Sequence, residues 1–481
     1  MAWLAECAAG GVTFYHGEAV EAGPGFVFEG AWAGAFAQQD LASAATVVGS
    51  GAALSGDGVL FIPPSHTLEG LYHHAGDGCF TISNSLVFVL ERLGATPAYD
   101  PHCGRRFASA VLGIEDYARP LISTDRGPVE RLLHGNLLLR PDGRTEQLRK
   151  PTLGPCPTFQ AYRDSLRSEL AAIFLNAADA ARRRRYRPVS TCSSGYDSTA
   201  CLVLARELGC DRAVTLTTAR GGVDDSGAEI AALLGVELQP FERIARATPE
   251  QMAEFVATGM GGEDVIYSAF DSAVAGSVLL TGFHGDKIWS RDAKPNVVLG
   301  RGDISGSSMG EFRLRTGFIH LPVPFIGALR HAEIAAISNG AEMAPWAVGG
   351  GYDRPIPRRI AEEAGVPRSA FGMTKKAASM LLFRDDEAQP NTRGNPGHFL
   401  ADLPLARRAA LRLRERLFEP RLSTAYRLDR APLRPLAHRL RDLLAADPRL
   451  FEHDRPTASL EFRSAVAAIR PRYSAVGTRR T

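Results

Sequence analysis

The chain has 481 residues, of which 45% are hydrophobic and 22% are charged, a balance typical of globular proteins that excludes wholesale disorder. At roughly 100–200 residues per domain, this length predicts about two to four domains. Lysine and arginine total 55 against 53 aspartate and glutamate residues, which gives a net charge of +2. That balance offers no global electrostatic reason to expect a nucleic-acid partner.

The seven cysteines predict neither a disulfide framework nor a zinc site, because their number is odd and no C-x-x-C pair occurs. The first residues, MAWLAECAAGG, lack the basic flank and the long apolar run of a signal peptide. No stretch approaches the run of about 18 apolar residues that a membrane-spanning helix needs. We therefore expect a soluble, cytoplasmic protein that has no membrane partner.

Residues 1–155 combine many glycines with short strand-like runs bounded by turn signals. These runs lie at 12–15, 58–62, 79–82 and 135–140. One apolar stretch at 86–93 predicts a helix, so we expect an α+β first domain. A proline-containing joint follows at 153–159 and leads into an amphipathic helix over 162–186. We interpret its arginine run, residues 182–185, as a solvated helix end rather than a phosphate or RNA site.

From Pro188 onward, short apolar strands alternate with helices, which predicts a parallel sheet flanked by helices. The strands are expected at 189–192, 213–217 and 278–281, and the helices at 199–208 and 227–234. Arg- and Leu-rich stretches at 405–417 and 436–444 predict further helices that pack on this part. The expected fold class is α/β, with an α+β domain at 1–155, a parallel-sheet domain at 156–400 and a helical extension at 401–481.

The segment with the strongest chemical signal is Ser193-Ser-Gly-Tyr-Asp-Ser198, between a strand and a helix expected to begin near Ser198. Such a loop aims backbone N–H groups and a helix N-terminus at a phosphate, and Ser193, Ser194 and Ser198 add hydroxyl donors. Asp197 beside an anion site predicts Mg²⁺, held by a carboxylate and phosphate oxygens. The alternative is an ordinary strand–helix turn with a serine cap. Neither the Walker pattern nor G-x-G-x-x-G is present.

The loop 193–198 resembles the S-G-G-x-D-S pyrophosphate loop of the ATP pyrophosphatases, with Ser194 in place of one glycine. Over about residues 160–390 the chain is similar to the synthetase domain of asparagine synthetase, β-lactam synthetase and lasso-peptide cyclases. DSGAEIAALLG at 225–235 resembles the family's helix after the second strand, and LTGFHGDKIW at 280–289 resembles its S-G-x-G-[AS]-D-E motif. YDRP at 352–355 with 366–376 resembles its closing segment, whose lysine contacts the reacting phosphate.

This family adenylates a carboxylate with ATP, releases pyrophosphate and lets an amine or ammonia attack the acyl-adenylate. The resemblance implies a pyrophosphatase-loop fold with ATP and Mg²⁺ as cofactors. It implies nucleotide binding by Ser193, Ser194, Gly195, Tyr196, Asp197, Ser198, Gly282 and Gly285. It further implies Mg²⁺ binding by Asp197 and Asp286, and stabilisation of the transition state by Lys375 or its neighbour Lys376. Only five lysines occur among the 55 basic residues, so this pair independently favours a functional role.

The first departure from the family lies at the N-terminus. Asparagine synthetases keep a nucleophilic cysteine directly after the initiator methionine, whereas this chain has Ala2. The first domain therefore resembles a degenerate glutaminase domain. We expect a glutamine-independent amide ligase of specialised metabolism, which takes a small-molecule or peptide carboxylate and an amine as substrates.

The second departure concerns the general base. Phe283 stands where the family has Glu or Tyr, and a phenyl ring transfers no proton. His284, whose ordinary pKa is about 6.5, is a candidate base, and the alternative is a structural histidine in a turn. Glu311 is a further acid/base candidate. Lys287 pairs either with a substrate anion or with a surface carboxylate. Asp224 and Asp225 could face the nucleotide, but Asp225 is expected rather to cap a helix.

Two other classes of function stay open. One is a pyrophosphatase-loop enzyme that modifies tRNA, for which a strongly basic face or paired cysteines would be expected. The other is a catalytically degenerate module that binds a nucleotide, which the substitutions at Ser194 and Phe283 favour. Self-association into a homo-oligomer is left open by the sequence.

Overall fold

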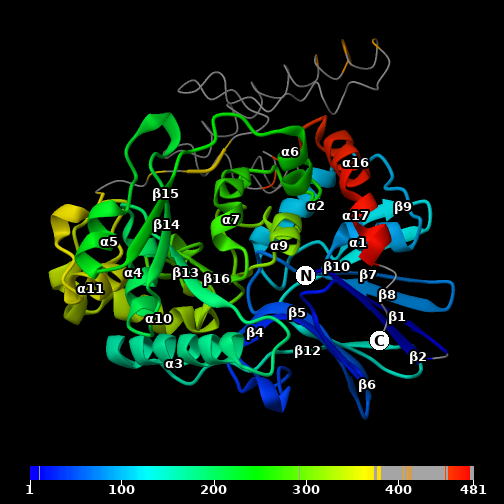
Figure 1. The fold of residues 1–481 in the computed structure, drawn as a ribbon, viewed down its shortest axis with the longest axis horizontal. Helices are drawn as coiled ribbons and strands as arrows, with labels where there is room; N and C mark the ends of the chain where they lie inside the picture. Colours follow the sequence, from blue (N-terminus) through cyan, green and yellow to red (C-terminus); the bar gives the residue numbers. More distant parts are fainter. Residues whose placement is uncertain are drawn as a thin grey trace.

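A computed structural model describes residues 1–9, 11–291, 293–372, 376, 378–380, 405, 409–410, 413, 450 and 453–476. Across these residues the fold is mixed α/β, with two antiparallel sheets and one parallel sheet. Figure 1 shows the antiparallel sheets, in blue and cyan, on one side of the molecule and the parallel sheet, in green, on the other. None of the described helices has the length and hydropathy that crossing a membrane requires.

The antiparallel sheets each have six strands, in the orders β2-β1-β8-β7-β10-β9 and β12-β11-β6-β5-β4-β3. They pack face to face over apolar side chains from both sheets, among them Trp3, Phe61 and Ile82. The strands are β1 (Trp3–Ala8), β2 (Gly11–His16), β3 (Glu21–Gly23), β4 (Phe26–Trp32), β5 (Val47–Ser55), β6 (Gly58–Ile62), β7 (Leu71–Gly76), β8 (Cys79–Ser83), β9 (Pro120–Thr124), β10 (Gly127–Leu132), β11 (Asn136–Leu139) and β12 (Thr145–Leu148). The predicted runs coincide with β2, β6, β8 and β11, which are confirmed.

Two helices lie among these strands in the chain, α1 (Leu86–Arg92) and α2 (Cys103–Ala108). The predicted helix at 86–93 is confirmed as α1, which starts where the Ser85 hydroxyl accepts a hydrogen bond from the Phe88 N–H at 3.1 Å. Such a cap stabilises a helix start because it pairs one of the free N–H groups there.

The long helix α3 (Phe159–Ala178) packs against β4, but it ends before the arginine run. Arg182 is buried and donates hydrogen bonds to the side chain of Asn176, at 2.7 Å, and to the carbonyl of Gly30. Its guanidinium also lies over the ring of Phe36, 4.7 Å from the centroid. The prediction of a solvated helix end is therefore wrong for Arg182, which ties α3 to the second antiparallel sheet.

The parallel sheet has the order β15-β14-β13-β16-β17. Its strands are β13 (Arg187–Thr191), β14 (Arg212–Leu216), β15 (Glu237–Phe241), β16 (Ser277–Thr281) and β17 (Ile319–Pro322). The helices α4 (Tyr196–Arg206) and α5 (Ala228–Leu234) follow β13 and β14, so the predicted strand–helix alternation and parallel sheet are confirmed. The sequence reasoning did not identify β15 and β17 at the two edges.

The remaining α-helices of the described residues surround this sheet and its junction with the first domain. They are α6 (Pro249–Val256), α7 (Asp271–Val274), α8 (Gly285–Ile288), α9 (Gly310–Thr316), α10 (His331–Asn339), α11 (Pro355–Glu363), α16 (Ala458–Ile469) and α17 (Pro471–Val476). The C-terminal helices straddle the junction, because α16 contacts α6 and α2 while α17 contacts α1. The helices predicted at 405–417 and 436–444 lie almost wholly outside the described residues.

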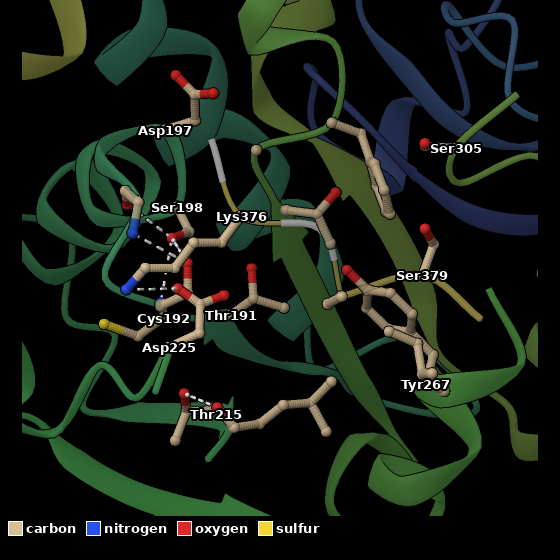
Figure 2. A pocket seen from close by; sticks show the side chains of 18 of the residues that line it. Thr191, Cys192, Asp197, Ser198, Thr215, Asp225, Tyr267, Ser305, Lys376 and Ser379 are labelled. Carbon is tan, nitrogen blue, oxygen red and sulfur yellow. Dashed lines mark hydrogen bonds and ion pairs between the residues drawn. The ribbon is translucent and has the colours of Figure 1, made fainter. Parts of the chain in front are cut away.

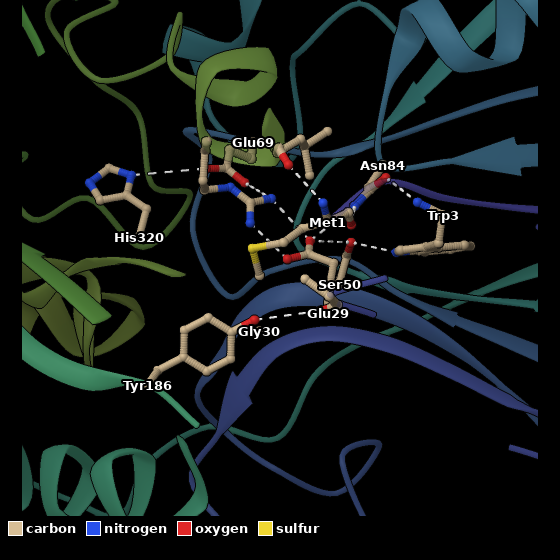
Figure 3. Close-up of polar contacts among 12 residues, drawn as sticks. Met1, Trp3, Glu29, Gly30, Ser50, Glu69, Asn84, Tyr186 and His320 are labelled. Atoms are coloured by element: carbon tan, nitrogen blue, oxygen red, sulfur yellow. Dashed lines mark hydrogen bonds and ion pairs between the residues drawn. The ribbon is translucent and has the colours of Figure 1, made fainter. Parts of the chain in front are cut away.

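A buried ion-pair cluster joins the antiparallel sheets to the parallel sheet. Arg313 on α9 donates to the carboxylate of Glu29 at 2.7 and 3.0 Å, and one of its nitrogens lies 2.7 Å from Glu69. Figure 3 shows Glu29, Glu69 and His320 of this cluster. Burial opposes the charge on Arg313, but the two carboxylates outweigh burial and raise its pKa. His320 on β17 lies 3.9 Å from Glu69 and hydrogen-bonds Thr281 at 2.9 Å. Polar contacts thus run from the antiparallel sheets to the end of β16.

Candidate functional site

A cavity of about 270 Å³ opens at the carboxyl ends of β13, β14 and β16, close to the lower end of the range for ligand sites. Because β14 and β16 lie on opposite sides of β13, this is the switch point where open α/β sheets bind ligands. Figure 2 shows Asp225, Ser198 and Lys376 on one side of the cavity, and Tyr267, Ser305 and Ser379 on the other.

The predicted loop 193–198 forms one wall of the cavity. The Ser193 N–H donates to the Ser198 hydroxyl at 3.1 Å, and the Gly195 N–H donates to the Ser193 hydroxyl at 3.2 Å. Helix α4 begins at Tyr196, and its N-cap, Gly195, makes no side-chain cap. The start of α4 therefore lacks the serine cap of the alternative interpretation. The positive end of the α4 dipole and its first N–H groups face a site where an anion binds favourably.

Not every residue of the predicted loop reaches the cavity. Ser193, Gly195, Asp197 and Ser198 line it, whereas Ser194 and Tyr196 are not among its lining residues. The Tyr196 side chain is fully buried, and its hydroxyl donates to the carbonyl of Tyr352. Tyr196 therefore packs behind the loop and does not face a ligand in the cavity.

The second predicted motif, at 282–287, lies in direct contact with this loop. A Cβ atom added to Gly282 would lie 2.9 Å from the Cβ of Asp197, and one added to Gly285 would lie 2.8 Å from its Cγ. A larger side chain at either position would push the two loops apart. Gly282 lines the cavity, while Gly285 is not among the lining residues and has a packing role.

The carboxylates predicted to hold Mg²⁺, Asp197 and Asp286, both line the cavity and both pair with cations of the chain. Asp197 accepts a hydrogen bond from Arg354, and Asp286 lies 3.0 Å from the Lys287 ammonium. Within the part of the chain that the structure describes, no group of three or more His, Cys, Asp or Glu side chains could hold a metal ion. The predicted Mg²⁺ site would need only these two carboxylates together with the phosphate oxygens of a nucleotide, so it stays a prediction.

The lysine that the structure places at the cavity is Lys376. Its ammonium donates to the Ser194 hydroxyl at 2.9 Å and to the carbonyl of Asp224 at 2.6 Å. Lys375, the neighbour that the resemblance also proposed, lies outside the described residues. The position of Lys376 beside the loop gives the cavity a positive charge next to the N-terminus of α4.

Asp225 contacts Ser194 and Lys376 instead of capping a helix. Its carboxylate accepts a hydrogen bond from the Ser194 hydroxyl at 2.6 Å and lies 4.0 Å from the Lys376 ammonium. The N-cap of α5 is Gly227, so the predicted capping role of Asp225 is wrong. Burial raises the pKa of Asp225, although Ser194 and Lys376 oppose that shift. Asp225 thus fixes Ser194 and Lys376 relative to each other.

His284 lines the cavity at a backbone φ of 75° and is 5% exposed. Its ring stacks on Phe325 with a centroid distance of 4.4 Å, and neither ring nitrogen has a hydrogen-bond partner among the described residues. Burial, with a smaller contribution from Arg301, lowers the pKa of His284 to about 3. The ring is therefore neutral at pH 7, and such a weak base does not fit the predicted role of accepting a proton from an ammonium.

Glu311 lies away from the cavity and is not among its lining residues. Its carboxylate accepts hydrogen bonds from the Ser85 hydroxyl at 2.6 Å and from the Tyr473 hydroxyl. Burial raises its pKa, although these hydrogen bonds oppose the shift. Glu311, the further acid/base candidate, thus joins α9 to the start of α1 and to α17.

Sequence reasoning missed the loop that closes the far side of the cavity. Asp264 accepts hydrogen bonds from the N–H groups of Gly306 and Ser308, at 2.8 and 3.0 Å, and from the Ser308 hydroxyl at 2.7 Å. These bonds hold Asp303 and Ser305 at the cavity. The only sequence signal was a run of small polar residues, GDISGSS at 302–308, which also fits any surface turn.

Neither a scan against models of protein families nor a search of the curated proteins found a match to this chain. The case for a function therefore depends on the geometry and the charges of the cavity.

Proposed function

We propose that the protein is an ATP-dependent, AMP-forming amide ligase similar to asparagine synthetase and β-lactam synthetase. One observation carries the proposal: the loops 193–198 and 282–286 contact each other through Asp197 at the switch point of the sheet. Beside this contact, the Lys376 ammonium donates a hydrogen bond to Ser194. This arrangement joins an anion-binding helix start to a lysine and leaves an open cavity beside both.

The cavity suits ATP in two respects. Ser193, Ser198 and Lys376 place hydroxyl and ammonium groups at the cavity for phosphate oxygens, beside the N-terminus of α4. The side chains of Val214, Leu216, Ile266 and Phe270 form an apolar wall that suits a flat aromatic base. ATP, when bound, supplies the phosphorus that a carboxylate attacks and the pyrophosphate that leaves.

The chain's own residues would position the reactants and stabilise charge. The hydroxyls of Ser193 and Ser198 are already oriented, because they lie 3.1 Å apart and hydrogen-bond each other. Lys376 is held by Ser194 and by the Asp224 carbonyl, so its ammonium need not reorganise when negative charge develops. The apolar walls from Ile266 and Phe270 exclude water, which would otherwise hydrolyse an acyl-adenylate.

Glutamine independence belongs to the same proposal. Ala2, which stands where the family has its glutaminase cysteine, is 5% exposed. The amino group of Met1 donates to the Leu314 carbonyl at 2.7 Å, beside the Glu29–Arg313 ion pair. These contacts support a first domain that has kept the paired sheets of a glutaminase-like fold without its chemistry. The nitrogen would then come from ammonia or from an amine substrate.

A second candidate is a catalytically degenerate module that binds a nucleotide. The pKa of His284, lowered to about 3, favours it, as does Phe283 in place of the family's base. No observation at the cavity favours the tRNA-modifying alternative.

The test is exchange of labelled pyrophosphate into ATP, with panels of carboxylic acids and amines, in the presence and absence of glutamine. We expect exchange that needs an acid, ignores glutamine and is lost in Asp197→Ala. Asp142→Ala, in the exposed turn between β11 and β12, is the matched control and should retain exchange. Binding of ATP without exchange for any acid would favour the degenerate module. Full exchange in Asp197→Ala would overturn the assignment of the loop.

A further inference from the structure

Arg354 places a buried guanidinium on the wall of the cavity. The residue is 5% exposed and stands at the N-cap of α11. Its guanidinium carbon lies 4.7 Å from the centroid of the Tyr352 ring and 5.7 Å from that of Tyr196, and the two rings lie 4.5 Å apart. Two aromatic rings therefore hold this cation in place.

The guanidinium of Arg354 keeps one N–H group that pairs with no described residue. One terminal nitrogen donates to Asp197, whereas the Nε–H is buried and has no hydrogen-bond partner among the described residues. Leaving the buried Nε–H unpaired is unfavourable. Arg354 also lines the cavity, which puts part of its side chain within reach of a ligand that brings oxygen atoms. A guanidinium binds phosphate oxygens through pairs of parallel hydrogen bonds.

Arg354 also interacts with both carboxylates that the sequence proposed as metal ligands, directly with Asp197 and at longer range with Asp286. Burial opposes its charge, but Asp197, then Tyr352 and, more weakly, Asp286 outweigh burial and raise the pKa of Arg354. A divalent ion between these carboxylates would meet a fixed positive charge that already occupies Asp197. The repulsion would be strong because the site is shielded from water.

We infer that Arg354 is the resident cation of this cavity, which keeps a free divalent ion from Asp197 and binds the phosphate oxygens of an entering nucleotide or pyrophosphate. The binding of nucleotide phosphate by Arg354 rests on the proposed function, whereas the exclusion of a free divalent ion from Asp197 does not. Arg354 and Lys376 then supply positive charge from two segments of the chain, one at Asp197 and the other at Ser194.

The first experiment titrates the protein with Mn²⁺ alone and follows free Mn²⁺ by electron paramagnetic resonance. We expect no Asp197-dependent binding in the wild type, and one new site in Arg354→Ala that disappears in Arg354→Ala/Asp197→Asn. Arg354→Gln is the second variant should Arg354→Ala not fold, as judged by circular dichroism. Mn²⁺ binding to the wild type that is lost in Asp197→Asn would overturn the inference.

The second experiment measures metal-free pyrophosphate binding by calorimetry. Arg354→Gln should weaken binding about 10- to 100-fold, the effect of losing charged hydrogen bonds. Arg354→Lys should restore it only in part, because an ammonium lacks the planar fork. Arg368→Ala, which removes a partly exposed arginine paired with Glu362, is the control and should bind like the wild type.

The two proposals fail in different ways. Unchanged pyrophosphate affinity in Arg354→Gln, with isotope exchange intact in the wild type, overturns the inference and leaves the proposed function standing. A wild type that binds neither pyrophosphate nor ATP overturns the proposed function and the inferred binding of nucleotide phosphate by Arg354. The Mn²⁺ titration decides the exclusion of the free ion in either case.

Discussion

Arg354 and Asp197 form an ion pair across the candidate site, although they lie 157 residues apart in the chain. Asp197 is in the first turn of α4, where the helix dipole favours a negative charge. Arg354 stands at the start of α11, where a positive charge is disfavoured. The favourable position of Asp197 on α4 therefore offsets the unfavourable position of Arg354 on α11. The two helices pack against each other.

The first prediction is that these two residues are energetically coupled. Asp197→Asn leaves the Arg354 guanidinium, whose side chain is 6% exposed, without a countercharge, so the free energy of unfolding should fall by about 1–3 kcal/mol. A double-mutant cycle with Arg354→Gln, measured by urea denaturation, should give a coupling free energy of about 1–3 kcal/mol. Additive effects of the two substitutions would contradict the pairing.

The second prediction separates the two neighbouring lysines. Lys376→Ala should lower pyrophosphate–ATP exchange about 100- to 1,000-fold, because it removes a positioned charge beside the loop. Lys375→Ala is the matched variant and should retain exchange within a few-fold of the wild type. The reverse ranking of the two rates would mean that Lys376 only supports Ser194 and Asp225.

The third prediction concerns His284. Its pKa is lowered to about 3, so as pH falls below about 6.5 the unfolded chain takes up a proton that the folded chain excludes. Stability is thus lost on acidification, by about 2 kcal/mol at pH 5 for this residue alone. His284→Asn, which suits the positive φ, should remove that part of the pH dependence.

The pKa values of His73, His134 and His320 are also lowered, to about 4, 4 and 3. The measurement is therefore the difference between wild type and His284→Asn in urea unfolding at pH 7 and pH 5. The pH profile of exchange above pH 6 should be the same for both proteins. A rate in His284→Asn that loses a titration near pH 6.5 would restore the histidine as the general base.

The fourth prediction concerns Glu311. Glu311→Gln should leave the rate and the pH profile of exchange unchanged, because the residue does not reach the cavity. Glu311→Leu should lower the free energy of unfolding by about 1–3 kcal/mol, since the hydroxyls of Ser85 and Tyr473 lose their acceptor. A loss of exchange in Glu311→Gln with unchanged stability would indicate a catalytic role after all.

The fifth prediction concerns the junction between the first domain and the parallel sheet. Arg313→Met leaves Glu29 buried without its countercharge, so the free energy of unfolding should fall by about 3–5 kcal/mol. The triple variant Arg313→Met/Glu29→Gln/Glu69→Gln should recover part of that loss, because no buried charge is then unpaired. An Arg313→Met protein as stable as the wild type would show that this cluster does not hold the two parts together.

The local elements of this fold could be predicted because their signals are local. Alternating strand and helix patterns after Pro188 predicted β13, α4, β14 and α5, and Gly235 closed α5 in the left-handed conformation. The strands β15 and β17 escaped notice because their sequences, ELQPF and IHLP, interrupt the apolar run with polar residues and proline. The arginine run at 182–185 was misjudged because the sequence does not show that Gly30 and Asn176 meet Arg182 in three dimensions.

By itself, the sequence determined that a small-residue loop, a glycine-rich turn and a lysine would be available, since each follows from residue types along a short stretch. Only the tertiary structure decided which charges meet. Asp197 pairs with Arg354 and Asp286 with Lys287, while Glu311 faces Ser85 and Tyr473 instead of the cavity. The physical reason is that Coulomb energies and hydrogen bonds depend on distance in space and on exclusion of water, and neither quantity is encoded in the spacing of residues along the chain.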